Sequence, residues 1–511
     1  MLVFLLLLST LLVTAVIELI MQGSIGSGVF SHLTNRVLNV VFGITIVLMI
    51  IVLVLENDNP IRTLAWVLVL LYLPVVGFIF YLFFGRNWRK TRIFSRKELE
   101  DSVNLNDLLG AQNLVEDHDS VTGNQLARKL IKLLESNSKA ILTRHNRIQI
   151  LPDTEWALEY VCQGIRNARN HIHLEYFSIS NDSTGKVIHD LLIEKAKQGV
   201  EVRFIYDDVG CWSLSSRFKR RLRKVGVQLE PFMPALIPWI NSHLNYRNHR
   251  KLIIVDGTIG YLGGLNIADK YLHKSKYFGY WRDSMIMIEG EGVRSLQALF
   301  LTDWYFVTRK NLLTRGYIQL DVNPDLAASN VPLQIVASGP DSDHASIMQA
   351  YFAAIANAQN TIDISTPYLI LNESLLTALK TAAMSGIRIR IIVPHKADHF
   401  IVFWGSKSYY EELLEVGVKI FEYHNGFMHA KVLIIDGEIA SIGTANMDLR
   451  SFNHNFELTA MIYDRNTAAI ASAQFENDLA YCKELILHEF RRRPLIQKPV
   501  ESVCRLFSPL L

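Results

Sequence analysis

The sequence has few cysteines, and they are not arranged for metal or disulfide chemistry. Only four occur among 511 residues, and they lie far apart: Cys162, Cys211, Cys482 and Cys504. No CxxC pair occurs, and no Cys/His spacing is typical of a zinc module. We therefore expect reduced, buried thiols. We expect no metal and no cofactor.

Charge is also scarce. Only 20% of the residues are charged, whereas 50% are hydrophobic, which is more apolar than a typical soluble chain. The net charge of +3 is too small to indicate a partner, so the distribution of charge matters more than its sum. The length exceeds what one ordinary core accommodates and predicts several domains.

The surplus of apolar residues is concentrated at the start of the chain. Residues 37–55 and 63–84 contain no charged residue, and each is long enough to cross a hydrocarbon layer of about 30 Å as a helix. Residues 2–21 form a third apolar run, interrupted by Glu18. This run lacks a basic start and a small-residue cleavage site, which favours a third span over a cleaved signal.

Basic residues follow the last apolar run and predict its orientation. They are Arg86, Arg89, Lys90, Arg92, Arg96 and Lys97. Because basic flanks stay on the inner side of a membrane, we expect everything after residue 85 to be cytoplasmic. Residues 1–96 are thus predicted to be a membrane anchor, and the polar stretch 97–123 a linker.

The remainder of the chain predicts an α/β fold that is present twice. Strand-like runs alternate with helix-like runs, which indicates mixed sheets covered by helices. "QGVEVRFIY" at 198 is answered by "SGIRIRIIV" at 385, and "KVGVQLEPF" at 224 by "EVGVKIFEY" at 415. We therefore predict two tandem domains, at 124–322 and 323–511.

One motif keeps its register between the copies. "NHRKLIIVDG" at 248 matches "MHAKVLIIDG" at 428, and the match continues without a gap. The paired positions, each separated by 180 residues, are His249 and His429, Lys251 and Lys431, Asp256 and Asp436, Gly264 and Thr444, and Asn266 and Asn446. A lone HxK pattern is weak, but two copies in register indicate a site.

The repeated residues suit the handling of a phosphate. The signature residues of both copies are predicted to be the catalytic set, namely His249, Lys251, Asp256, His429, Lys431 and Asp436. In an extended strand His249 and Lys251 share a face, whereas Asp256 has the opposite parity and is expected to have a structural role within this set. Imidazole is both a nucleophile and a proton carrier near neutral pH, and lysine and asparagine bind phosphate oxygens. Two half-sites therefore provide one histidine to attack phosphorus and another to protonate the leaving oxygen.

A catalytic histidine also needs an acceptor that orients it. Asp283 and Glu457 begin the next strand-like run in each copy, and we expect them to fill this role. Phosphate contacts are expected from Lys251 and Lys431, with further contacts from the residues at the four paired positions after the motif, namely Asn266, Asn446, Gly264 and Thr444. The copies are so alike that spacing does not distinguish the nucleophile.

The doubled HxKxxxxD motif with its trailing Gly and Asn resembles the phospholipase D superfamily. The sequence is more similar still to bacterial cardiolipin synthases, through "NPIRTLAWVLVLLYLPVVGFIFYLFFGRN" (59–87), "MDLRSFNHNFEL" (447–458) and "RLFSPLL" (505–511). In one departure, "LGGLN" places Gly264 where many relatives carry a serine.

The resemblance implies an α/β fold of two tandem phospholipase D-like domains that form one pseudo-twofold active site. It implies transfer of a phosphatidyl group between two phosphatidylglycerols, giving cardiolipin and glycerol through a phosphohistidine without a metal. It further implies that His249 is the nucleophile and His429 the acid and then the base. The implied location is the bacterial cytoplasmic membrane, as a multi-pass protein with its catalytic domains on the cytoplasmic side.

Alternative functions remain open from the sequence. A phosphodiesterase that uses water shares the first step, and a non-catalytic scaffold disagrees with the intact paired motifs. The expected partners are phosphatidylglycerol, cardiolipin and an anionic membrane surface, not nucleic acid, and an oligomer is compatible with the sequence.

Three further features of the sequence are an apolar segment, two basic runs and a set of histidines outside the motifs. Residues 231–248 are about eleven residues longer than their counterpart, and form either an apolar lip at the lipid interface or a buried loop. The basic runs at 217–224 and 491–493 are either membrane contacts or solvated surface. The histidines without an in-register partner are expected to be structural: His243, His395, His399, His424 and His454.

Overall fold

The computed structural model describes residues 123–234, 246–318 and 329–508, together with 60–72 and six single residues near them, 43, 47, 50, 51, 77 and 81. Residues 1–87 and 88–511 form two separate units, which are described individually.

In the first unit, helix α3 (Pro60–Tyr72) begins at a proline, which lacks the N–H that a first helical turn leaves unbonded. Among the helices that the structure describes, none combines the length and apolar content needed to cross a bilayer. The predicted span 2–21 and most of 37–55 lie outside the described residues, and of 63–84 the structure describes 63–72, 77 and 81. The three spans therefore remain predictions.

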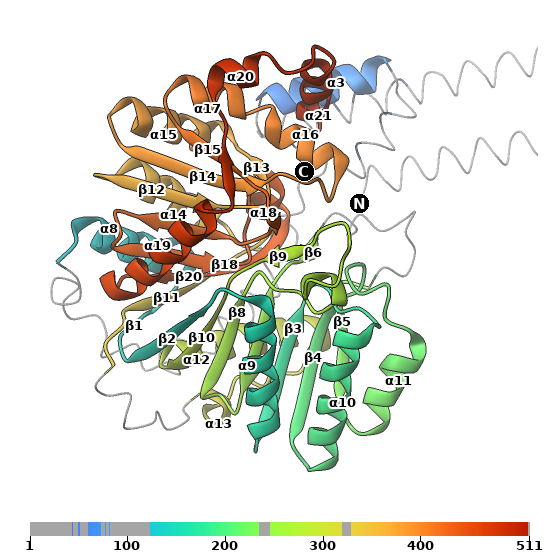
Figure 1. The fold of residues 1–511 in the computed structure, drawn as a ribbon. Coiled ribbons are helices and arrows are strands. Elements are labelled where there is room, and N and C mark those ends of the chain that lie inside the picture. The colour runs from blue at the N-terminus through green and yellow to red at the C-terminus, as the bar shows by residue number, and fades with distance from the viewer. Residues whose placement is uncertain are drawn as a thin grey trace, which may run out of the picture. The chain divides into compact units, whose positions relative to one another are not determined.

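The second unit contains the two predicted copies, which are two mixed sheets (Figure 1). The first half consists, in chain order, of β2 (Asn146–Leu151), α9 (Thr154–Asn167), β3 (His171–Tyr176), α10 (Ser183–Lys197), β4 (Glu201–Asp207), α11 (Ser216–Lys224), β5 (Gln228–Phe232), β6 (Arg247–Asn248), β7 (Lys251–Val255), β8 (Ile259–Gly263), η4 (Asp269–Tyr271), β9 (Tyr280–Arg282), β10 (Met285–Gly290), α12 (Gly292–Thr308) and α13 (Arg315–Ile318).

The second half repeats the pattern with additions. It consists of β11 (Leu333–Ser338), α14 (Ser346–Ala356), β12 (Thr361–Ser365), β13 (Leu369–Ile370), α15 (Glu373–Met384), β14 (Arg388–Pro394), α16 (Phe400–Lys407), α17 (Tyr410–Glu415), β15 (Lys419–Tyr423), β16 (Gly426–Met428), β17 (Val432–Ile435), β18 (Ile439–Gly443), β19 (Met447–Asp448), α18 (Leu449–Asn453), β20 (Asn455–Ile462), α19 (Arg465–Leu479), β21 (Cys482–Glu484), α20 (Leu487–Arg491) and α21 (Gln497–Leu506).

The strand orders match between the halves. The first sheet runs β2-β10-β8-β7-β3-β4-β5, and the second contains β11-β20-β18-β17-β12-β14-β15 in the equivalent order. In both, three neighbouring strands are parallel and the remainder antiparallel. The duplication is confirmed down to the turns, since Gly199 and Gly386 share a φ of +91° and +92°, which favours glycine.

The first helix and strand after residue 122 pack with the second half. Helix α8 (Gln125–Ser138) lies in the same apolar core as α14 and α15, and β1 (Leu142–Thr143) pairs with β11. The domain boundaries predicted at 124 and 322 remain predictions.

Helices cover both faces of the first sheet, and N-terminal caps define where helices begin. Helices α9, α10 and α11 pack on one face, whereas α12 lies on the other and shares an apolar core with β11 and β20. Asp153 caps α9 by accepting from the N–H groups of Glu155 and Trp156. The core shared through α12 joins the two halves.

Candidate active site

Each motif begins by pairing with the other half of the molecule. Strand β6, which leads into His249, is parallel to the start of β20 in the second half. Strand β16, which leads into His429, is parallel to β9 in the first half. The N–H of His249 donates to Phe456 O at 2.9 Å, and that of His429 to Arg282 O at 2.7 Å.

This pairing corrects one expectation about local structure. The run "HRKLIIVD" was expected to be one strand, but β7 begins only at Lys251. His249 lies in the break between β6 and β7, because its N–H bonds to the other half and not to the neighbouring strand β3. The break turns the imidazole out of the sheet ladder and into the junction between the halves.

The orienting carboxylates are exchanged between the halves. Nδ1 of His249 lies 2.9 and 3.0 Å from the two carboxylate oxygens of Glu457 on β20. Nδ1 of His429 lies 2.6 Å from Oδ2 of Asp283, which follows β9. Each contact fixes the proton on Nδ1 and leaves Nε2 as the lone-pair nitrogen. Within the described residues, Nε2 of neither ring takes part in a hydrogen bond.

Both motif lysines curl back toward their own histidines. Lys251 Nζ donates to the backbone oxygen of His249 at 2.7 Å, and Lys431 donates likewise to that of His429. Lys431 Nζ also lies 2.9 Å from Nδ1 of His429. Since that nitrogen donates its proton to Asp283, it cannot also accept one from an ammonium, so we assign the lysine bond to the carbonyl.

Burial and neighbouring charges shift the pKa values of all four groups. Burial, opposed by the carboxylate, lowers the pKa of His249 to about 4, and burial together with Lys431 lowers that of His429 to about 4. Burial likewise lowers the pKa of Lys251 to about 7 and of Lys431 to about 8.

The charges also act across the halves. Lys431 lowers the pKa of His249, and Lys251 lowers that of His429. Burial alone would raise the pKa of Glu457, but His249 and Lys251 lower it below the usual value. The carboxylates are therefore ionised and the histidines neutral at pH 7. This cross-talk means that the two motifs form one electrostatic site.

The two orienting carboxylates accept different hydrogen bonds from their neighbours. Glu457 accepts from the Thr444 hydroxyl at 2.5 Å and from the Asn455 side chain at 3.2 Å. Asp283 instead accepts from the backbone N–H of Ser284 at 2.8 Å.

Positions 264 and 444 both contact the orienting carboxylates, and their predicted phosphate contacts remain predictions. Thr444 gives its single hydroxyl hydrogen to Glu457. Gly264 donates its N–H to Ser284 O at 2.9 Å. A Cβ at Gly264 would lie 2.1 Å from Asp283 Oδ1, so glycine here makes room for the carboxylate. Positions 264 and 444 therefore support Asp283 and Glu457.

Asn266 and Asn446 are both buried beside the motifs. The Asn446 side-chain N–H donates to Asp448 at 3.1 Å, and the amide oxygens of both asparagines have no partner among the described residues. Their predicted phosphate contacts remain predictions.

The motif aspartates are structural anchors. Asp256 accepts the backbone N–H groups of residues 169, 170 and 171 at 2.7–2.9 Å. Asp436 does the same for residues 359, 360 and 361 at 2.7–2.9 Å. Both have a left-handed φ, of +52° and +54°. Each lies at the far end of its strand, about 20 Å from the histidine, which favours a structural role, and their predicted place in the catalytic set remains a prediction.

The sequence did not reveal a charged network beneath the first motif. Arg250 forms a buried ion pair with Asp303 of α12, and Glu175 accepts from the Asn248 side chain at 2.6 Å. Burial and Asp303 hold the pKa of Glu175 well above its usual value. The only signal was the polar pair Asn248 and Arg250, which the second motif replaces with methionine and alanine.

Comparison with known proteins decides the family. The family described as "Cardiolipin synthase, PLD-like domain" matches residues 161–304 and 351–479, which span both motifs. The chain belongs to this family. A second family, described as "Phospholipase_D-nuclease N-terminal", matches residues 43–86.

The relatives cover almost the whole chain. A cardiolipin synthase of Geobacillus sp. (strain WCH70) is 44% identical over 93% of this chain and 94% of its own length. The major cardiolipin synthase ClsA of Bacillus subtilis (strain 168) is 40% identical over 94% and 100%. Among solved structures, a phosphatidylserine synthase of Haemophilus influenzae Rd KW20 has a TM-score of 0.56 at 16% identity, covering 76% of this chain and all of that one, and it shares the fold.

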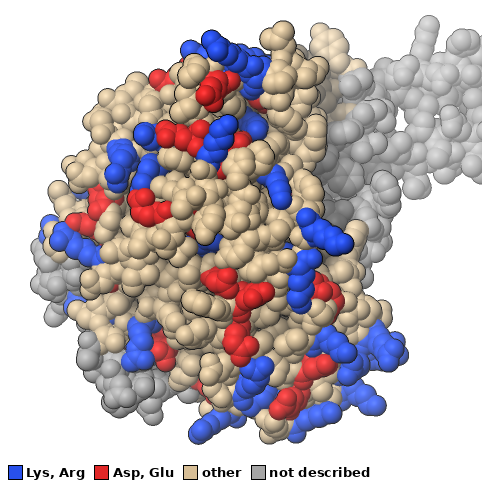
Figure 2. Space-filling model, in the orientation of Figure 1, with Lys and Arg blue, Asp and Glu red and all other residues tan. Residues whose placement is uncertain are grey.

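For three features the sequence left membrane contact open, and the structure describes both basic runs and the two ends of the apolar segment 231–248. Residues 217–224 form the basic helix α11, over which Lys and Arg gather at the lower right of Figure 2. Arg491 and Arg493 instead form ion pairs with Glu411, Glu415 and Glu501, which accounts for most of the charge of the run 491–493. Residues 235–245 of the predicted lip lie outside the described residues.

Proposed function

We propose that the chain is a cardiolipin synthase, a phosphatidyltransferase that converts two phosphatidylglycerols into cardiolipin and glycerol. One observation carries the proposal: two His/Lys half-sites meet, and each histidine is oriented by a carboxylate of the other half. The family membership supports the same reaction. Neither step of the proposed sequence requires a cofactor.

In the first step Nε2 of His249 attacks the phosphorus of one phosphatidylglycerol, and the bond from phosphorus to the glycerol headgroup oxygen breaks. The leaving oxygen takes a proton from His429. Glu457 stabilises the cation that forms on His249 as its Nε2 becomes bonded to phosphorus. Assignment of the nucleophile to His249 rests on resemblance to the superfamily.

In the second step the glycerol hydroxyl of another phosphatidylglycerol attacks the phosphohistidine. His429 takes its proton, the bond between phosphorus and His249 breaks, and cardiolipin leaves. In the free protein His429 is neutral at pH 7, because its pKa is about 4. A bound phosphodiester brings a negative charge that favours the protonated imidazole, so substrate binding prepares the acid.

Lys251 and Lys431 hold the phosphate oxygens in this proposal. They are buried beside the histidines, and their charges lower the pKa of both. A compact ammonium neutralises the phosphodiester as well as the extra charge that develops in the transition state. Asn266 and Asn446 complete the oxygen contacts.

The anchor and topology belong to the same proposal. Spans over 2–21, 37–55 and 63–84 hold the protein in the bacterial cytoplasmic membrane, with residues after 85 on the cytoplasmic side. The apolar segment 235–245 and helix α11 contact an anionic lipid surface. Proteolysis of inverted membrane vesicles should then degrade the catalytic unit, whereas right-side-out vesicles should protect it.

Product analysis tests the proposal. Purified full-length protein is given vesicles of phosphatidylglycerol, and lipids and free glycerol are quantified. We expect cardiolipin and glycerol in equal amounts. Phosphatidic acid without cardiolipin would instead mean that water is the acceptor and would overturn the transferase assignment.

A trapping experiment tests the assignment of roles. With His429→Ala, we expect a phosphatidyl adduct to accumulate on His249 and to be detected by mass spectrometry of acid-free digests. The matched His249→Ala protein should carry no adduct. An adduct on His429 in His249→Ala alone would reverse the roles.

A further inference from the structure

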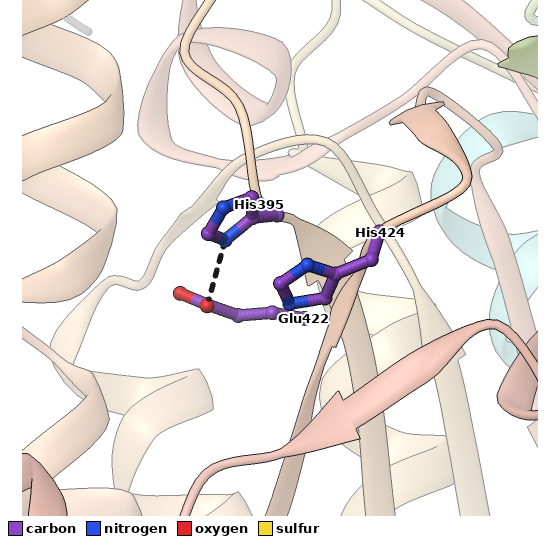
Figure 3. A group of neighbouring side chains, drawn as sticks. All are labelled: His395, Glu422 and His424. Carbon is purple, nitrogen blue, oxygen red and sulfur yellow. Dashed lines mark hydrogen bonds and ion pairs between the residues drawn. The ribbon is translucent and has the colours of Figure 1, made fainter.

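A second cluster of histidine and carboxylate side chains lies in the second half, outside the histidine–lysine site. It consists of His395, Glu422 and His424, shown in Figure 3. The ligand atoms of the three side chains lie within 4.8 Å of one another. No other such group of three metal-ligand side chains occurs among the described residues.

The strand register explains why these residues meet. Strands β14 and β15 are parallel and pair Pro394 with Tyr423, so the next residues along, His395 and His424, are neighbours too. Their rings stack at 4.0 Å between centroids. Glu422 precedes His424 by two positions and therefore shares its face of the strand. Backbone pairing up to the last residues of β14 and β15 thus brings the three residues together.

The contacts of the carboxylate suit a metal ligand. Glu422 is buried, whereas both histidines are exposed. Its Oε2 lies 3.0 Å from Nδ1 of His395, and Figure 3 marks this hydrogen bond. Its Oε1 lies 3.1 Å from Lys407 Nζ. A carboxylate held on one oxygen by an ammonium can present the other oxygen to a cation, as ligating carboxylates commonly do.

We propose that His395, Glu422 and His424 form a binding site for a divalent transition-metal ion of the zinc class. Two imidazoles and one carboxylate are a ligand set that Zn²⁺ takes, with water completing a tetrahedron. The ion would replace the proton shared by His395 and Glu422. Bonds of about 2.0–2.1 Å require ligand atoms about 3.4 Å apart, which a small rotation of the exposed imidazoles achieves.

The position of the cluster connects it to both halves. His424 precedes β16, the strand that carries the chain to His429. The residues after His395 contact the first half, because Lys396 Nζ donates to Tyr277 O at 2.8 Å and the Tyr277 hydroxyl to Ala397 O at 2.9 Å. A bound ion would therefore brace the ends of β14 and β15 where the halves meet, and stabilise the fold without entering the chemistry.

Cobalt and zinc titrations test the site. Full-length protein is purified without a polyhistidine tag and freed of metal. Co²⁺ is added as a visible probe, and Zn²⁺ binding is measured by calorimetry. We expect one equivalent of each ion, with absorption bands of low-symmetry Co²⁺. His395→Ala and His424→Ala should each weaken binding at least tenfold, and Zn²⁺ should raise the Tm of the unaltered protein but not of His424→Ala.

The matched control is His399→Ala. This exposed histidine lies nearby and precedes α16 without capping it through its side chain. It should bind Co²⁺ like the unaltered protein. Absence of a stoichiometric Co²⁺ spectrum would overturn the proposal. So would Co²⁺ binding by His395→Ala and His424→Ala as tight as that of the unaltered protein. None of these measurements requires lipid turnover, so their failure is distinct from failure of the proposed transferase activity.

Discussion

Beneath His249 the first half places the Arg250–Asp303 ion pair and the buried Glu175, whereas the corresponding residues before and after His429 are Met428 and Ala430. The two motifs present the same histidine and lysine, but the residues that flank and support them differ. Met428 and Ala430 themselves lie in an apolar cluster, and the buried charge beside this motif, the Arg282–Asp478 ion pair, comes from residues outside the motif. The first motif rests on buried charges, each of which must keep its partner. The comparison teaches that the signature residues define the chemistry, while the residues between them are free to change how it is supported.

The largest expected effect breaks the chemistry of both halves equally. His249→Ala and His429→Ala should each lower turnover of phosphatidylglycerol by about 10⁴–10⁶-fold, because nucleophile and proton carrier act as one unit. Turnover is measured by cardiolipin formation. The unfolding midpoint of each variant serves as the control for folding. Retention of more than a tenth of the activity by either variant would contradict a site shared by the two motifs.

The second prediction concerns the Arg250–Asp303 ion pair, which supports the first motif and has no equivalent at Ala430 in the second. Arg250→Met should lower the free energy of unfolding by about 3–5 kcal/mol, because it leaves Asp303 buried without its partner. Urea unfolding provides the measurement. The double variant Arg250→Met/Asp303→Leu should recover much of the loss, since it removes both charges.

The equivalent position in the second half gives the matched control. Ala430→Gly should cost only about 1 kcal/mol, the usual cost of the added backbone freedom and a lost methyl group. Equal losses for Arg250→Met and Ala430→Gly would contradict this difference in support between the two motifs.

Sequence reasoning identified the duplication, the motif and both orienting carboxylates, because these are properties of one chain and its register. It did not identify which carboxylate serves which histidine. That choice depends on β6 and β16, pairings of two and three residues that cross between the halves and leave no periodicity to detect. The hydrogen bond from Thr444 to Glu457 was not predicted for the same reason, since the two side chains meet only in three dimensions.

The cluster at His395 was missed on different grounds. Its histidines were compared between copies, and neither has a counterpart in the first half. They meet because parallel strands β14 and β15 hold Pro394 beside Tyr423, a register that spacing along the chain does not specify. Glu422 and His424, two residues apart at the end of β15, were the only sequence signal available.

A third prediction concerns the lysines. Their pKa values of about 7 for Lys251 and about 8 for Lys431 lie below the usual value near 10.5. As pH rises through 7–8 in the free protein, both lose the charge that binds phosphate, so kcat/KM should fall about tenfold or more between pH 7 and 9. Short-chain phosphatidylglycerol below its micelle concentration is the substrate. Arginine stays charged, so in Lys251→Arg kcat/KM should decline only at the higher pH where Lys431 loses its proton. A kcat/KM of the unaltered protein that stays constant up to pH 10 would contradict this prediction.

The smallest expected effect concerns Asp256 and Asp436, which make the same backbone contacts in both halves. Asp256→Asn and Asp436→Asn keep the left-handed turn that asparagine tolerates but lose a charged acceptor of three backbone N–H groups. Each should lower the free energy of unfolding by about 1–3 kcal/mol while leaving kcat within about twofold. A large loss of kcat in a variant that remains folded would place the aspartate in the chemistry.

The central claim is that each histidine is oriented by the carboxylate of the other half. The direct test is hydrogen exchange at the imidazole C2 of single histidines, followed by mass spectrometry in Glu457→Gln and Asp283→Asn. Each carboxylate raises the pKa of its imidazole, so removing it lowers that pKa and slows exchange at neutral pH. We predict slower exchange at His249 but not His429 in Glu457→Gln, and the converse in Asp283→Asn, each with activity about 10²–10⁴-fold lower. Slower exchange at His429 in Glu457→Gln, or equal slowing at both histidines, would contradict the exchange of carboxylates between the halves.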